Sequence, residues 1–164
     1  MVNNNFKHTD PDDFHGKELT LHDCISDKIS FKDNILRFYL SDGFWVTPHN
    51  EKNSSEKVVR TDASVVDFSV EDIDDIIVRV FTRHRWLGFR NTSVELWDME
   101  QLISAINSGK CTLEFITQYR SHYEQMWRCA IHSKKKPYYR ECQLHLPETE
   151  ATFFWNDLRP DREW

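Results

Sequence analysis

The residues that could do chemistry in this chain are thinly spread. His22 and Cys24 lie two residues apart, so on a strand they would share a face and could supply two ligands of a zinc site if others converged on them. The other cysteines, Cys111, Cys129 and Cys142, each fall in register with apolar side chains on an expected strand. That pattern is typical of small buried core residues. We therefore expect four thiols in a reducing compartment, and neither a metal ion nor a cofactor.

The number and spacing of the glycines exclude several classes of enzyme. The chain has only four glycines, and no two of them lie within twenty residues of each other. Phosphate-cradling loops and the strand-to-helix nucleophile elbow need clustered glycines, because their backbones turn tightly or approach a ligand closely. This excludes the common nucleotide-dependent enzymes and the α/β-hydrolases. Carboxylates on polar strand faces could meet as an acid–base pair, but the sequence does not say which would meet. We therefore assign no catalytic residue.

The charge is unevenly distributed along the chain. Residues 1–82 hold 9 Lys or Arg against 16 Asp or Glu, a balance of −7, whereas residues 83–164 hold 12 against 11, a balance of +1. A net charge of −6 argues against nucleic-acid binding, because the phosphate backbone requires a basic face. Charge steering favours a basic protein partner instead. We predict that the partner-binding surface lies in the acidic half and contains Asp62, Asp67, Glu71, Asp72, Asp74 and Asp75.

Two other interpretations remain open. The first is a small-ligand or enzymatic pocket within a curled sheet, lined by Trp45, Trp127, Tyr119 and His22. The second is a homodimer formed when the edge strands of two copies pair across a two-fold axis. The sequence alone does not choose between them.

One segment predicts the principal helix, over about residues 98–108. Asp98 is a good N-cap, Gln101 completes a capping box, and Gly109 ends the helix. Polar residues such as Asn107 are expected to look outward. Burying the apolar face outweighs the roughly 1 kcal/mol of a cap, so the helix must pack on a flat apolar surface, which we take to be a β-sheet. That face is formed by Met99, Leu102, Ile103 and Ile106.

Outside the helix the pattern alternates between apolar and polar residues, which predicts about ten short strands. We expect an α+β fold of predominantly antiparallel β structure, a curled sheet, half-barrel or sandwich, with the helix closing one open face. Residues 1–17 lack periodicity and are expected to be an N-terminal arm, while residues 18–164 form a single β-rich domain. No stretch is apolar enough for a membrane span or a signal peptide, so a cytoplasmic location is expected.

Residues 21–25, Leu-His-Asp-Cys-Ile, precede an alternating hairpin that ends in residues 36–40, Leu-Arg-Phe-Tyr-Leu. This run resembles the first strands of small, uncharacterised bacterial β-rich proteins, some of which accompany polymorphic toxins as immunity proteins. The resemblance implies a non-enzymatic binder, and it assigns no functional residue. Immunity-type proteins often mask a basic nuclease surface, with which an acidic half is compatible. We therefore predict a binding protein that engages a basic partner.

Overall fold

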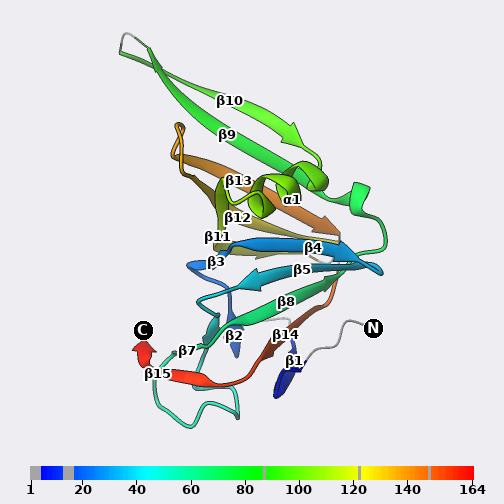
Figure 1. The fold of residues 1–164 in the computed structure, drawn as a ribbon, viewed down its shortest axis with the longest axis vertical. Coiled ribbons are helices and arrows are strands. Elements are labelled where there is room, and N and C mark those ends of the chain that lie inside the picture. The colour runs from blue at the N-terminus through cyan, green and yellow to red at the C-terminus, as the bar shows by residue number, and fades with distance from the viewer. Residues whose placement is uncertain (1–4, 13–16, 87, 122, 148) are drawn as a thin grey trace.

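The computed structural model describes residues 5–12, 17–86, 88–121, 123–147 and 149–164. Its strands form three antiparallel sheets (Figure 1). The five-stranded sheet has the order β1 (His8–Pro11), β14 (Ala151–Trp155), β8 (Ser64–Ser69), β5 (Ile35–Leu40) and β4 (Lys28–Lys32). The six-stranded sheet has the order β10 (Phe89–Trp97), β9 (Ile77–Trp86), β13 (Tyr139–Pro147), β12 (Glu124–Ser133), β11 (Cys111–Arg120) and β3 (Cys24–Ser26). The four-stranded sheet has the order β15 (Leu158–Glu163), β7 (Val59–Thr61), β6 (Trp45–Val46) and β2 (Leu19–Thr20).

The α+β class with predominantly antiparallel strands is confirmed, since among the described residues one α-helix and one short 3₁₀ helix accompany fifteen strands that curl around a shared core. The count exceeds the ten expected because β2, β3 and β6 have only two or three residues each, too few to show an alternating pattern. Residues 8–11, expected to lie in an arm, instead pair as edge strand β1 with β14. That strand is only half-buried, so its sequence carries little apolar alternation.

Edge-to-face aromatic contacts join the two larger sheets. The ring of Phe38 on β5 lies 5.7 Å from that of Phe68 on β8 and 5.2 Å from that of Phe115 on β11, measured between centroids. Phe115 in turn lies 5.2 Å from Trp127 on β12. All four side chains are buried. Each such pair adds about 0.5–1.5 kcal/mol beyond the burial of its area, so the core is continuous from one sheet to the other.

Helix α1 (Met99–Asn107) confirms the prediction for this segment. The Asp98 carboxylate accepts a hydrogen bond from the backbone N–H of Gln101 at 2.6 Å, and the Gln101 side chain accepts one from the N–H of Asp98 at 3.0 Å. Gly109, with φ at +68°, follows the helix end. Met99, Leu102 and Ile106 are buried, and Ile103 is partly buried against the same core. The helix packs against β4, β11 and β9, so it contacts both larger sheets.

Asn107 is exposed, as expected, and its side chain also binds the edge of the five-stranded sheet. Its side-chain Oδ1 accepts a hydrogen bond from the backbone N–H of Ile29 on β4 at 2.9 Å, and its Nδ2 donates to the carbonyl of Ile29 at 2.7 Å. The amide therefore takes the place of a neighbouring strand. The helical pattern does not predict this contact, because it depends on a strand 78 residues away.

In the part of the chain that the structure describes, no helix is both long and apolar enough to cross a membrane.

Replacing Asn107 by Ala should lower the free energy of unfolding by about 1–2 kcal/mol, measured by urea denaturation. Two hydrogen bonds worth about 0.5–1.5 kcal/mol each are lost, while the better helix propensity of Ala returns a few tenths. The exposed Ser104→Ala is the control, because it changes propensity without removing a bond to β4. Equal stability of the two variants would contradict this role of Asn107.

Candidate functional site

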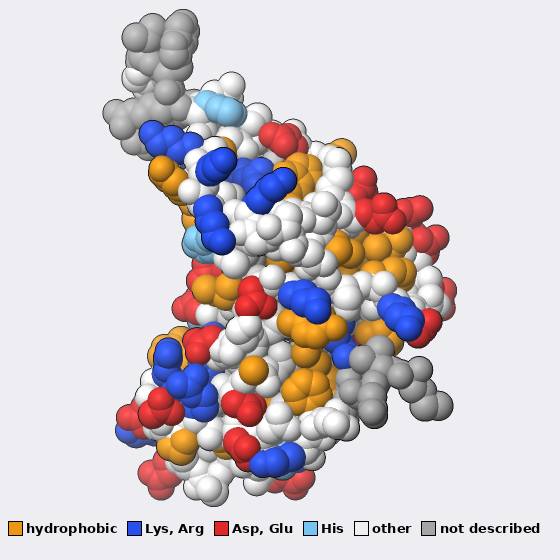
Figure 2. Space-filling view, viewed as in Figure 1, with side chains coloured by type: hydrophobic (Ala, Val, Ile, Leu, Met, Phe, Trp, Pro, Cys, Tyr) orange, Lys and Arg blue, Asp and Glu red, His pale blue; other side chains and the backbone are white. Residues whose placement is uncertain are grey.

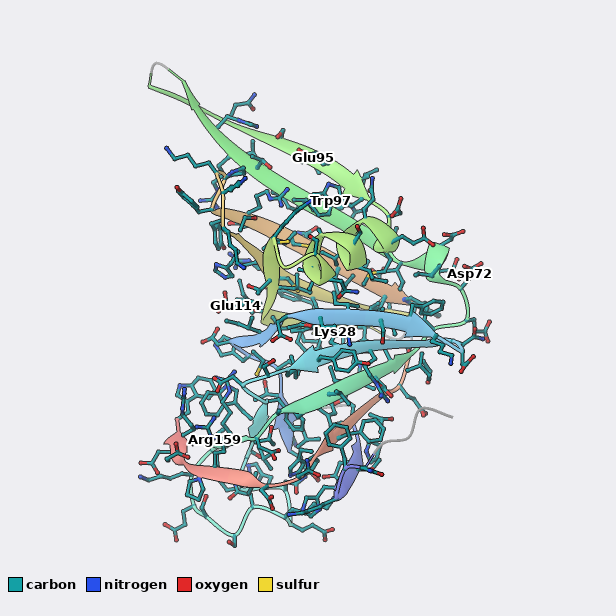
Figure 3. All side chains as sticks on the ribbon, in the orientation of Figure 1. Lys28, Asp72, Glu95, Trp97, Glu114 and Arg159 are labelled. Carbon is teal, nitrogen blue, oxygen red and sulfur yellow. The ribbon has the colours of Figure 1, made fainter. Side chains whose placement is uncertain are left out.

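Four of the predicted partner-binding carboxylates lie together on the surface. Glu71, Asp72, Asp74 and Asp75 are exposed around the 3₁₀ turn η1 (Ile73–Asp75), which follows β8 and is marked by Asp72 in Figure 3. The Asp72 carboxylate caps the turn by accepting a hydrogen bond from the N–H of Asp74 at 3.0 Å. Among the described residues, no Lys or Arg forms an ion pair with these four. Their negative charges are therefore not neutralised within the described chain.

The other two predicted carboxylates are separate from this surface, which corrects the sequence interpretation. Asp67 is buried, only 8% exposed, and forms a two-point ion pair with Arg37, with both N–O distances at 2.6 Å. The two residues lie opposite each other on β8 and β5, a pairing that the sequence does not reveal. Asp62 lies beyond the other end of β8, where its carboxylate accepts a hydrogen bond from the N–H of Asn156 at 3.2 Å. The candidate surface therefore excludes both.

The acidic turn borders a cavity of about 480 Å³. Three exposed carboxylates line it, from Glu71, Asp75 and Glu150. Apolar side chains also line it, from Ile35, Val70 and Pro147. We call this cavity, which these six residues line together with Asn34, Ser69 and Thr149, the acidic groove. A Lys or Arg side chain pairs an apolar stem with a cationic head, so the groove matches such a side chain in both chemistry and polarity.

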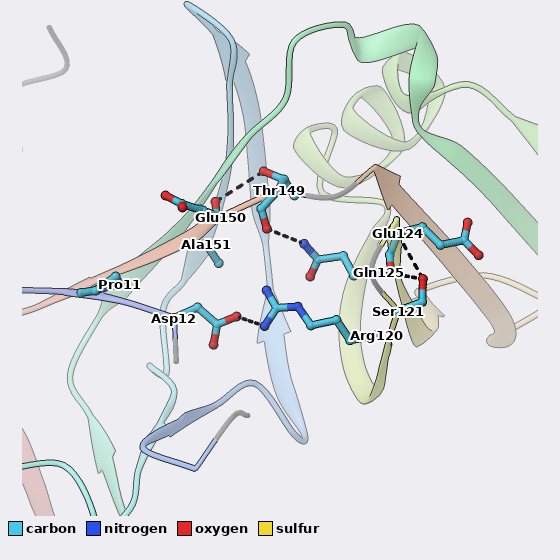
Figure 4. A pocket seen from close by; sticks show the side chains of 9 residues that line it. All are labelled: Pro11, Asp12, Arg120, Ser121, Glu124, Gln125, Thr149, Glu150 and Ala151. Carbon is cyan, nitrogen blue, oxygen red and sulfur yellow. Dashed lines mark hydrogen bonds and ion pairs between the residues drawn. The ribbon is translucent and has the colours of Figure 1, made fainter. Parts of the chain in front are cut away.

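A second cavity, of about 520 Å³, lies beyond the segment Thr149–Glu150, because both cavities are lined by these two residues. Asp12 and Arg120 form an ion pair across it at 2.8 Å, with 8% and 17% of their side chains exposed (Figure 4). Gln125 on β12 is buried, and its side chain donates a hydrogen bond to the carbonyl of Thr149 at 3.1 Å. This bond fixes the segment that carries Glu150.

Glu124 adds a further carboxylate at the second cavity. Its Oε2 lies 3.9 Å from Nδ1 of His145, and Arg79 donates a hydrogen bond to the Nε2 of that ring at 2.8 Å. Burial, and then the charge of Arg79, lowers the pKa of His145. The imidazole is therefore neutral at pH 7, so it does not pair with Glu124 as a cation. Glu124 and Glu150 were not predicted, because no local pattern shows that their segments meet near the acidic turn.

The residues expected to line a ligand pocket do not form one site. His22 and Trp127 do line one cavity, but its volume of about 160 Å³ is below the roughly 300–1,000 Å³ of ligand pockets. Tyr119 is 52% exposed and lines a different cavity. Trp45 packs on Trp164, and its Nε1 donates to the carbonyl of His22 at 2.9 Å.

The four cysteine thiols do not lie on the surface of the described structure. Cys24, Cys111, Cys129 and Cys142 are free and buried. Burial raises the pKa of all four thiols, to about 12 for Cys24 and for Cys142. A protonated thiol is a poor nucleophile and a poor metal ligand. Within the described ranges, no group of three His, Cys, Asp or Glu side chains could hold a metal ion.

Comparisons of this chain with protein-family models, with curated proteins and with solved structures find no match. What the acidic groove can bind is therefore inferred from the chemistry of the residues that line it. Exposed carboxylates on apolar walls can hold a cationic side chain by ion pairing and by contact with its stem.

We expect the four thiols to react with iodoacetamide at pH 8 at least about a hundredfold more slowly in the folded protein than in urea. A thiol with a pKa of about 12, as for Cys24 and Cys142, holds about a thousandfold less thiolate at this pH than one with the ordinary pKa of 9.0. Intact-mass spectrometry over time measures the reaction. Labelling of any of the four at its unfolded rate would show that the site is open.

Asp67→Ala should lower the free energy of unfolding by about 3–5 kcal/mol, because it removes the carboxylate that pairs at two points with the buried Arg37 guanidinium. Thermal or urea denaturation measures the loss. Asp74→Ala, on the exposed turn, should stay within about 0.5 kcal/mol of the wild type. Recovery of most of the stability in Arg37→Met with Asp67→Leu would assign the loss to the broken ion pair.

Proposed function

We propose that this protein is a non-enzymatic binding protein that engages a basic segment of a protein partner through the acidic groove. One observation carries the proposal: Glu71, Asp75 and Glu150 surround an apolar-walled cavity of about 480 Å³ and have no ion pair within the described chain. A Lys or Arg side chain that enters would place its stem on Ile35 and Pro147 and its head among the carboxylates. Such partly desolvated charge pairs are stronger than pairs in open solvent.

The surroundings of the groove favour the same kind of partner. Asp72 and Asp74 extend the negative charge along the turn, and Glu124 extends it beyond Thr149–Glu150. Charges of one sign on a binding face raise the association rate with an oppositely charged partner, and salt screens them over about 10 Å at 0.1 M. Association through this face should therefore be fast at low ionic strength and slower at high ionic strength.

Our proposal extends to the class of partner and the compartment. Surfaces that bind nucleic acid are basic, so a nuclease offers the cationic side chains that the groove would accept. This agrees with the immunity-type role that the resemblance of residues 21–25 and 36–40 implies. Four free thiols suit a reducing compartment, and we propose the cytoplasm.

A fluorescein-labelled peptide of alternating Arg and Ser tests the groove by fluorescence anisotropy. The wild type should bind it saturably, with an affinity that falls as salt is raised. Glu71→Gln with Glu150→Gln should weaken binding by about tenfold, or about 1.4 kcal/mol, because two charges around the same cavity are removed.

The matched control is Glu51→Gln with Glu56→Gln, which removes two exposed glutamates outside the groove and leaves the same net charge. Its affinity should stay within about twofold of the wild type, since distant surface charges are screened. Equal losses in both double variants would mean that the peptide responds to net charge alone, and the groove would not be the binding site.

A further inference from the structure

A cluster of cations surrounds a different cavity, at the turn between β12 and β13 beside the end of α1. The cavity has a volume of about 520 Å³, and five basic side chains line it: Lys110, Lys134, Lys135, Lys136 and Arg140. Its less polar lining comes from Ala105, Cys111 and Pro137. We call this site the basic cavity. Figure 2 shows Lys and Arg side chains gathered on this upper part of the molecule, apart from the carboxylates of the acidic turn.

These five cations line one cavity and have no counter-charge in the described chain, where Lys28, Lys32 and Arg79 also lack an ion pair. No carboxylate described in the structure forms an ion pair with any of them. Most other described Lys and Arg side chains are paired, including Lys7, Arg37, Lys52, Lys57, Arg60, Arg83, Arg120, Arg128, Arg159 and Arg162. The partial negative charge at the end of α1 can offset about half a unit charge. Most of the positive charge therefore remains without a partner.

Arg140 is held in place while its hydrogen-bonding capacity stays uncommitted. Its guanidinium lies over the ring of Trp97, with Cζ 4.8 Å from the ring centroid. Its Nε is shielded from solvent and has no hydrogen-bond partner in the described structure. Buried polar groups in proteins are nearly always paired, so an unpaired one requires an explanation. Since Nε is shielded, the Nη–H donors of this stacked guanidinium are the ones that can bind two oxygens of one anion.

We propose that the basic cavity binds a phosphate monoester that carries an apolar or aromatic group. A monoester brings between one and two negative charges and three acceptor oxygens, which can engage Arg140 and several lysines at once. A lone carboxylate would leave most of these cations unpaired. The apolar walls at Ala105 and Pro137 provide contact for the esterified group, and the volume falls within the range of small-molecule pockets. This site lies outside the acidic groove, so it is an additional function.

Phenyl phosphate is a suitable probe, with binding measured by isothermal titration calorimetry. We expect saturable binding with a Kd of about 1 mM or tighter for a ligand of this size. Inorganic phosphate should bind more weakly, because it makes no contact with the apolar walls. Arg140→Gln should weaken the binding of phenyl phosphate by at least about tenfold.

Arg140 also packs on Trp97, so its replacement can alter the fold. Lys135→Gln with Lys136→Gln avoids this, because both lysines are exposed, and it should weaken binding by at least about fivefold. Lys28→Gln with Lys32→Gln removes two exposed lysines elsewhere and should leave the Kd within about twofold. Equal affinities of the two lysine double variants, equal binding of phenyl and inorganic phosphate, or binding of a single-stranded oligonucleotide without binding of phenyl phosphate would each overturn the proposal.

Discussion

The edge-to-face contact between Phe38 and Phe115 connects two sheets whose strands do not pair with each other. Backbone hydrogen bonds fix the strands within each sheet, whereas side-chain packing contributes most to the position of one sheet relative to the other. The interlocked rings on both sides of this contact leave little freedom, because aromatic pairs depend on distance and tilt. The positions of α1, of the acidic groove and of the connection after β13 all follow from the resulting angle between the sheets.

Ion pairs divide the surface of this acidic molecule into neutral and charged regions. Buried pairs such as Arg37–Asp67 and Arg120–Asp12 cancel charge where desolvation would otherwise be costly. Among the described residues, two groups of unpaired charges each gather around one feature, the carboxylates at the acidic turn and the cations at the basic cavity. A net charge of −6 describes neither place, since opposite local excesses are averaged in the sum. Local pairing is therefore a better guide to binding on this fold than overall charge.

The features that could be predicted from the sequence are those set by residues close together along the chain. The cap at Asp98, the buried positions of α1 and the burial of the cysteines all follow from spacing within a few residues. The parts that could not be predicted depend on strand pairing. Asp67 was assigned to a partner surface because its opposite residue, Arg37, is 30 positions away. Glu150 was missed for the same reason, since only the packed connection after β13 brings it beside the acidic turn.

The two hydrogen bonds between Asn107 and Ile29 have a consequence for the behaviour of the chain in solution. They occupy backbone groups of β4, the last strand of its sheet, which could otherwise accept a strand from another molecule. The same helix covers apolar core with Leu102 and Ile106. Local opening of α1 therefore uncovers an unpaired edge and a hydrophobic surface together, and aggregation is expected to start from this partly unfolded form rather than from the fully unfolded chain.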